Sequence, residues 1–154
     1  MSAESKIPPK INDDERIIRV LMNPRHLKGE LIKWNCFRSK AGLDEVSVIR
    51  IEFCNEQFCK DWGKKIEQFD RGNHYYGLAA LLTKEIRSLG CDVVFTPSEQ
   101  THAFHADIVF GYVLKSGESP PSEIKFKMEE LARLSRIYVD SQPDKKEWVD
   151  GIVA

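Results

Sequence analysis

The chain has 154 residues, a formal net charge of −1, a hydrophobic share of 42% and a charged share of 31%. This length and composition are typical of one globular domain and exclude an extensively disordered protein. A net charge so close to zero gives no overall field that attracts nucleic acid or anionic membranes, so a dedicated nucleic-acid-binding protein is not favoured.

The first ten residues lack the apolar stretch of a secretory signal peptide. No apolar run approaches the ~20 residues that a membrane-spanning helix needs. The four cysteines, Cys36, Cys54, Cys59 and Cys91, include no Cys-x-x-Cys pair and are too sparse for a secreted disulfide framework. The sequence therefore predicts a soluble cytoplasmic protein with reduced thiols and no membrane contact.

The N-terminal part of the chain contains a polar lead-in followed by two predicted strands. Residues 1–14 are polar, include two adjacent prolines and are predicted to be a flexible N-terminal segment. Alternating branched apolar residues over 15–22 predict a strand, which Pro24 stops. The same alternation over 46–53 predicts a second strand with one core face.

A helix is predicted after the second strand. Asn55 is a good N-cap, and bulky apolar residues recur every four positions from Phe58 to Ile66, which predicts one buried helical stripe. A short helix over 84–89 and a strand over 91–95 follow.

The C-terminal third contains the strongest strand signal of the chain. Residues 108–113 are apolar on both faces, which is typical of a central strand. A last helix is predicted over 123–137, capped by Ser122. Residues 141–154 are a polar C-terminal tail, either loose or docked on the domain, and Trp148 favours docking.

These elements together predict an α+β fold. Residues 15–140 are expected to form a single globular domain, built on a mixed sheet of four to five strands. Two main helices and one short helix are expected to pack on that sheet.

The candidate catalytic residues are His102, His105 and Asp107. An imidazole titrates near neutral pH, and a nearby carboxylate orients it and raises its pKa, so this group suits acid–base chemistry. If residues 105–109 are extended, His105 and Asp107 share one strand face. The competing interpretation is that these residues only mark the entry to a strand. Cys91 is a possible nucleophile, although a small buried cysteine is the simpler interpretation.

No metal ion and no cofactor are predicted. Metal sites do combine histidine with carboxylate at short spacing, but a third ligand here would have to come from a distant part of the chain. The sequence contains neither GxGxxG nor GxxxxGK[ST], so neither common nucleotide-binding loop is present.

Residues 25–40 are the most basic segment of the chain, with the aromatic residues Trp34 and Phe37 among the charges. Cations interleaved with aromatic rings are typical of an anion or nucleic-acid contact. The residues expected to make that contact are Arg25, Lys28, Lys33 and Arg38. The alternative is that the aromatic residues anchor a loop while the cations are only solvated.

A second anion site is conceivable on the strands. Arg19, Arg38 and Arg50 would form one if their strands are adjacent, which the sequence does not establish. Arg50 also has a simpler interpretation, as a surface residue that pairs with an acid such as Glu52.

Three functions are consistent with these features. The leading one is a small protein that binds another protein, as an adaptor, subunit or immunity-type domain, because no strong catalytic signature is present. The first alternative is an enzyme that acts on a small or phosphorylated substrate, with His105 as acid or base, Asp107 orienting it, and His102 or an arginine holding an anion. The second alternative is a nucleic-acid contact through residues 25–40, which is not favoured.

Overall fold

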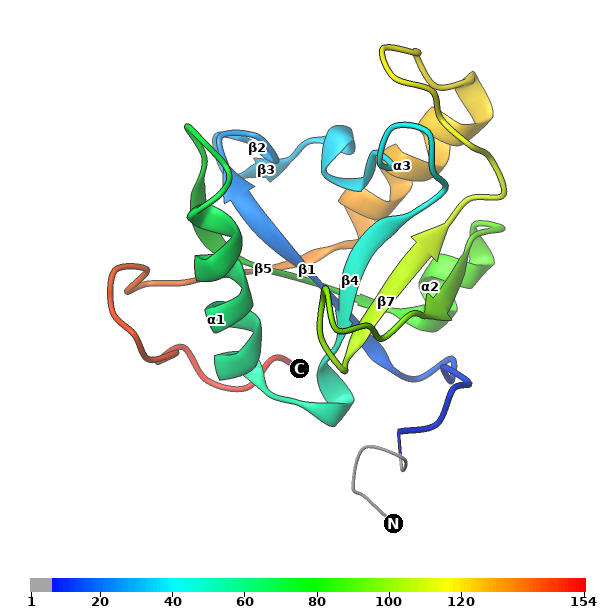
Figure 1. The fold of residues 1–154 in the computed structure, drawn as a ribbon. Coiled ribbons are helices and arrows are strands. Elements are labelled where there is room, and N and C mark those ends of the chain that lie inside the picture. The colour runs from blue at the N-terminus through cyan, green and yellow to red at the C-terminus, as the bar shows by residue number, and fades with distance from the viewer. Residues whose placement is uncertain (1–6) are drawn as a thin grey trace.

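The computed structural model describes residues 7–154, which form an α+β fold (Figure 1). Within that range the large sheet has six strands in the order β6-β7-β4-β1-β5-β8. These strands are β1 (Arg16–Asn23), β4 (Val46–Arg50), β5 (His74–Leu82), β6 (Asp92–Phe95), β7 (His105–Val109) and β8 (Arg136–Val139). The remaining elements are the hairpin β2 (Leu27–Lys28) and β3 (Leu31–Ile32), and the helices α1 (Glu56–Glu67), α2 (Thr83–Ser88) and α3 (Ser122–Leu134).

The predicted α+β class, with two long helices and a short one, is confirmed. The predicted mixed sheet of four to five strands is wrong, because six strands are present and every neighbouring pair among them is antiparallel. β5 is buried on both faces and therefore lacks the alternation of a half-exposed strand. The residues of β8 begin inside the predicted helix 123–137, but the backbone becomes extended at Ser135.

The predicted central strand over 108–113 is also displaced. The strand begins earlier, at His105, and ends at Val109. The carboxylate of Asp44 accepts hydrogen bonds from the backbone N–H groups of Phe110 (2.7 Å) and Gly111 (2.8 Å). These amides are therefore satisfied by a side chain and do not continue the strand ladder.

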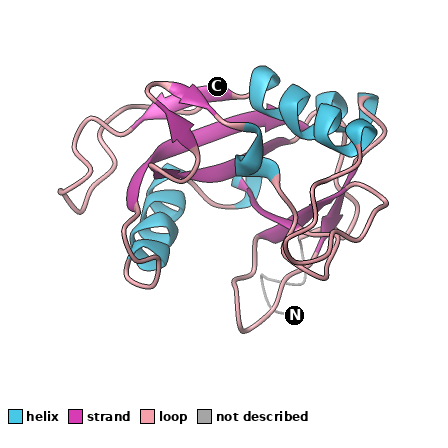
Figure 2. Cartoon of the chain, turned by 90° about the horizontal axis from the view of Figure 1, so that it is seen from above, coloured by secondary structure: helices cyan, strands magenta, loops and turns pink. Residues whose placement is uncertain are grey.

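The two faces of the sheet bury two separate apolar clusters, because alternate residues of β1 point in opposite directions. Ile17 and Leu21 belong to the cluster that includes Met128 of α3, and Ile18 belongs to the cluster that includes Cys59 of α1. Figure 2 shows the long helices on opposite sides of the strands.

The sheet is split between β1 and β4. β1 pairs with β5 from Arg16 to Asn23, but it pairs with β4 only at Ile17↔Arg50 and Ile18↔Ile49. Beyond these pairs the two strands diverge (Figure 1). The divergence opens a space beside α1.

Both terminal segments contact the sheet and its helices. The backbone carbonyl of Pro8 accepts a hydrogen bond from Arg50 at 2.7 Å. At the other end, Lys60 of α1 donates to the carbonyls of Gln142 (2.9 Å) and Glu147 (2.7 Å), and Val153 is fully buried. The predicted flexible segment, residues 1–14, lies partly outside the described residues. No helix between residues 7 and 154 is long and apolar enough to cross a membrane.

Candidate functional site

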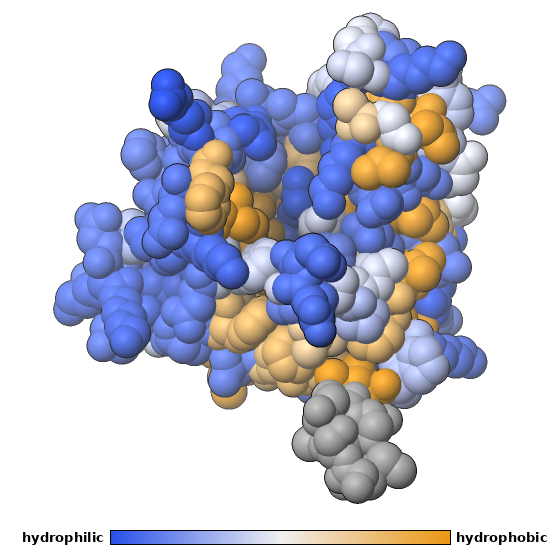
Figure 3. Space-filling model, viewed as in Figure 1, coloured by the Kyte–Doolittle hydropathy of each residue, from blue (hydrophilic) through white to orange (hydrophobic). Residues whose placement is uncertain are grey.

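A cleft of about 300 Å³ occupies the space where β1 and β4 diverge. Figure 3 shows it as a hollow bordered mostly by hydrophilic residues. Its walls come from β1 and the turn after it, from α1 and the segment after it, and from β4, β7 and the loops that precede these two strands. The lining residues are Ile18, Arg19, Val20, Met22, Arg25, His26, Lys40, Ser47, Val48, Ile49, Trp62, Ile66, Asp70, Thr101 and His105.

Arg19 bridges the split in the sheet. Its Nε donates to the carbonyl oxygen of Cys36 and its Nη1 to that of Ser47, both at 3.0 Å. A backbone carbonyl that has lost its ladder partner needs another donor, and the guanidinium supplies one. The charge of Arg19 is therefore held in place by two neutral oxygens and is not neutralised by them.

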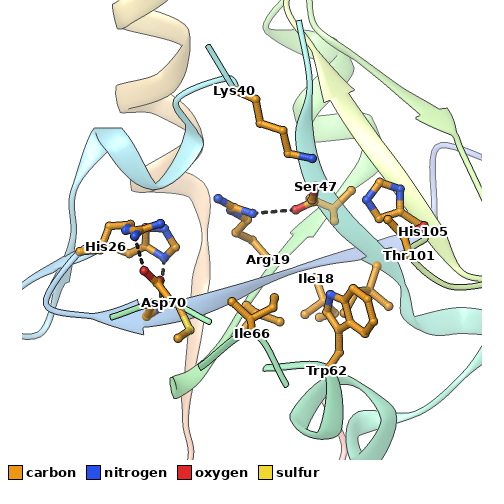
Figure 4. Close-up of a pocket in the computed structure, with 15 residues that line it drawn as sticks. Ile18, Arg19, His26, Lys40, Ser47, Trp62, Ile66, Asp70, Thr101 and His105 are labelled. Carbon is orange, nitrogen blue, oxygen red and sulfur yellow. Dashed lines mark hydrogen bonds and ion pairs between the residues drawn. The ribbon is translucent and has the colours of Figure 1, made fainter. Parts of the chain in front are cut away.

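Lys40 approaches the same region from the opposite side, as Figure 4 shows. Among residues 7–154, neither Arg19 nor Lys40 has a carboxylate oxygen within 4.0 Å. Asp70 also lines the cleft, but its Oδ1 is paired with Arg25. The cleft thus contains two cations with unused binding capacity.

His26 is a buried, neutral histidine in the wall of the cleft. Its Nδ1 accepts a hydrogen bond from the backbone N–H of Met22 at 3.1 Å, so the proton lies on Nε2. Burial, and then the positive charges of Arg19, Arg25 and Lys33, lower its pKa to about 3. At neutral pH His26 is therefore a hydrogen-bond donor without charge.

His105 has the opposite tautomer. Its Nδ1 lies 3.2 Å from the carbonyl oxygen of Thr96, which can only accept, so Nδ1 carries the proton and Nε2 has a free lone pair. The same Nδ1 lies 2.9 Å from Thr96 Oγ1, whose hydroxyl donates to Asp107 Oδ2 at 2.8 Å. Asp107 thus acts on His105 through Thr96, since its own oxygen is 3.9 Å from Nδ1.

The environment of His105 suits a base. Burial lowers the pKa of His105, and the charge of Lys40 acts in the same direction, while Asp107 and Thr96 raise it. The imidazole is 5% exposed, and its Nε2 has no hydrogen-bond partner among the described residues. A neutral imidazole with a fixed tautomer and an unused lone pair is the form that accepts a proton.

His102 has a different position from the other two candidate residues. Its ring packs edge-on against Trp62 (4.6 Å between centroids) and Phe58 (5.0 Å), and its Nδ1 accepts from the backbone N–H of Phe104. Burial lowers its pKa to about 4. The structure thus brings His105 and Asp107 together and places His102 in an aromatic cluster next to the cleft.

The predicted basic contact residues are divided among several places. Arg25 lies at the cleft and pairs with Asp70, and Arg38 donates to the backbone carbonyl of Glu118 at 2.6 Å. Lys28 and Lys33 line a separate shallow groove beside the β2–β3 hairpin.

Three residues of the site were not among the sequence candidates for it. Lys40 belongs to the basic segment, but only the fold shows which of its cations reaches the cleft. Thr96 carried no signal beyond ending a strand. The sequence suggested an anion site that combines Arg19 with Arg50 if their strands are adjacent. The strands are adjacent, but Arg50 is buried in an ion pair with Glu15 and does not contribute to the cleft.

No group of three or more potential metal-binding side chains occurs in the part of the chain that the structure describes. Cys91 is buried, and burial raises its pKa to about 11, so the thiolate needed for nucleophilic attack is disfavoured at neutral pH.

Comparisons with protein-family models, with characterised proteins and with solved structures found no match for the chain. The chemistry of the cleft is therefore the guide to function.

Proposed function

We propose that the cleft between β1 and β4 binds a small anionic substrate, such as a phosphate ester, and that His105 acts on it as an acid–base group. The observation that carries this proposal is the pair of unneutralised cations, Arg19 and Lys40, in the same cleft as His105. The four cysteines are free thiols, which supports a cytoplasmic location.

The anion preference follows from the electrostatics of the cleft. A guanidinium with two of its groups already fixed loses little freedom when it binds an anion, and its remaining donors match phosphate or carboxylate oxygens. The neutral Nε2–H of His26 adds a donor that does not repel cationic neighbours. The one carboxylate of the lining, Asp70, pairs with Arg25 through Oδ1, and its Oδ2 is buried without a hydrogen-bond partner among the described residues.

The acid–base role follows from the hydrogen bonds of His105. Thr96 holds Nδ1–H, so Nε2, which is buried and has no partner among the described residues, is the atom left to exchange a proton with a bound ligand. Asp107, linked through Thr96, stabilises the imidazolium that forms after proton transfer. Asp107 is thus a positioning residue.

Inorganic phosphate is the probe for the anion site, and NMR titration of the protein is the measurement. Lys40→Gln is expected to weaken phosphate binding at least tenfold, because a partly desolvated cation–phosphate contact contributes about 1.5–3 kcal/mol. Lys28→Gln is the matched control, since Lys28 is an exposed lysine on β2 outside the cleft. Equal losses in the two variants would contradict the proposal.

The imidazole signals of the same sample test His105. Bound phosphate is expected to raise the pKa of His105, because the anion stabilises the imidazolium. The signals of His74, which is exposed and is not one of the lining residues, serve as the internal reference. A His105 titration that is unchanged by saturating phosphate would argue against the acid–base role.

Protein binding, the leading function from the sequence, is the second candidate. Large apolar side chains are exposed at the end of α1, on α3 and near the C-terminus, where Phe69 (81%), Phe126 (57%) and Ile152 (82%) stand out. Photo-crosslinking from position 126 in cells is expected to give one discrete adduct if α3 contacts a protein partner.

Nucleic-acid binding through residues 25–40 stays a prediction, and a steep loss of binding with added salt would support it.

A further inference from the structure

A second groove, of about 340 Å³, adjoins the cleft. The two share Lys40, Thr101 and His105 as lining residues. The second groove lies over β6 and β7, whereas α1 packs on β1 and β5. His105 therefore stands between the two halves of one continuous surface.

The second groove offers acceptors where the cleft offers donors. Asp107 is 2% exposed, its Oδ2 accepts from Thr96, and its Oδ1 has no hydrogen-bond partner among residues 7–154. A carboxylate accepts several hydrogen bonds, and a buried oxygen without one is costly. Glu45 lies at the same groove and adds further acceptor atoms. This half of the surface calls for a ligand group that donates hydrogen bonds.

Hydroxyl groups fit the second groove better than an ammonium group does. Lys40 lines this groove as well as the cleft, and its positive charge opposes a second cation nearby. The hydroxyls of Ser98 and Thr101 also line the groove; they are hydrogen-bonded to each other at 2.8 Å, so one of the two keeps a proton to donate to an alcohol.

We propose that the substrate is a phosphorylated polyol, with its phosphate at Arg19 and Lys40 and its hydroxyl groups against Asp107 and Glu45. This inference rests on the proposed function for the position of the phosphate, and it adds the chemical class of the rest of the molecule. The part of the substrate between its phosphate and its hydroxyl groups then lies beside His105, which is common to both halves of the surface.

Three phosphate esters with three-carbon chains distinguish a polyol substrate from one without hydroxyl groups and from one with an ammonium group. Glycerol 1-phosphate and propyl phosphate have the same chain length and the same phosphate, and they differ only in two hydroxyl groups. Aminopropyl phosphate places an ammonium where the polyol has a hydroxyl. Calorimetric affinities are expected to favour glycerol phosphate over propyl phosphate at least tenfold, since a site built to bind a hydroxyl rejects the analogue that lacks it.

Asp107→Asn is expected to reduce that ratio to below about threefold, because the amide is a weaker acceptor than the carboxylate. The ratio is taken within one variant, so a general change in phosphate affinity cancels. Glu45→Gln, at the rim of the groove, supplies the same measurement if Asp107→Asn does not fold.

Different results would contradict the polyol inference and the proposed anion site. Equal affinities for glycerol phosphate and propyl phosphate in the native protein, with both weakened by Lys40→Gln, would overturn the polyol inference and leave the anion site standing. Tighter binding of aminopropyl phosphate than of glycerol phosphate would likewise overturn it. Phosphate binding that is insensitive to Lys40→Gln would contradict the proposed function itself.

Discussion

Two arginines on neighbouring strands, Arg50 of β4 and Arg19 of β1, illustrate two uses of the same side chain. Arg50 is fully buried and donates to both oxygens of Glu15, at 2.9 and 2.8 Å. Its guanidinium also stacks near the rings of Phe53 (4.7 Å) and Phe95 (4.6 Å). Arg19 is only partly buried and donates to two backbone carbonyls, with no carboxylate beside it.

The two arginines exemplify two kinds of charge: a structural charge, which is buried and paired with a carboxylate, and an available charge, which has no carboxylate partner. A buried cation must be neutralised by a fixed partner, because leaving it unpaired costs several kcal/mol. A cation at a cleft is stabilised by water and neutral oxygens until an anion arrives. The presence of arginine on a strand therefore says little about function, and the partner of that arginine says much more.

The largest effect is expected for Arg50→Met. The substitution leaves the carboxylate of Glu15 buried without its cation, which is expected to lower the free energy of unfolding by about 3–5 kcal/mol. Denaturant unfolding measures the change. The double variant with Glu15→Gln should recover part of the loss, and an Arg50→Met protein of native stability would remove the contrast with Arg19.

Lys60→Met tests the other buried ion pair. Lys60 is paired with Asp140 at 3.0 Å, both side chains are fully buried, and Lys60 also holds two carbonyls of the C-terminal segment. We expect a loss of about 3 kcal/mol in unfolding free energy and faster amide exchange in residues 141–154. The control Lys64→Met removes a partly exposed pair with Glu67 and should cost less than about 1 kcal/mol.

The pH dependence of stability reports the buried histidine of the cleft. The pKa of His26 is about 3 in the folded protein against its ordinary value of 6.5, so the unfolded chain binds the proton more tightly. Stability is therefore full above pH 6.5 and falls as the pH drops towards 3, by about 2 kcal/mol at pH 5 from this residue.

His26→Asn sharpens that measurement. Asparagine keeps an acceptor for the backbone N–H of Met22 but does not titrate, so the variant should lose less stability between pH 7 and pH 5. Thermal unfolding at both pH values provides the data. Identical pH profiles for variant and native protein would show that His26 is not the buried neutral group described above.

Arg19→Gln is expected to lower stability less than Arg50→Met or Lys60→Met does. Glutamine retains a donor for one of the two carbonyls, so the loss in unfolding free energy should be about 1 kcal/mol. Phosphate affinity should nevertheless fall at least tenfold, because the charge is gone. A loss as large as that of Arg50→Met, without a change in phosphate binding, would place Arg19 with the structural charges.

The sequence predicted features whose causes are local. The start of α1 is an example, because the Oδ1 of Asn55 accepts from the backbone N–H of Phe58 at 2.9 Å, as an N-cap does. β5 was not assigned as a strand because neighbours on both faces bury it, and the resulting apolar run has no period. β8 follows α3 so closely that its apolar residues continued the helical pattern.

The part of the site that was predictable from the sequence is also the part with a local cause. His105 and Asp107 are two residues apart on one strand, so their common face follows from strand geometry alone. The meeting of Arg19 with Lys40 depends on how far β1 and β4 diverge, which is a property of the whole sheet. The interpretation of Arg50 as a surface residue paired with Glu52 is wrong, because the fold buries Arg50 against Glu15 and pairs Glu52 with Arg16.

The split between β1 and β4 also links occupancy of the cleft to the mechanical continuity of the sheet. Arg19 is the only side chain in residues 7–154 that donates to the Ser47 carbonyl, so it acts as a clasp across two strands that do not otherwise pair there. We predict that an anion bound by Arg19 stabilises this contact between the strands, and by reciprocity a more stable contact strengthens binding of the anion. Amide exchange along the split would then serve as a gauge of binding that requires no knowledge of the reaction.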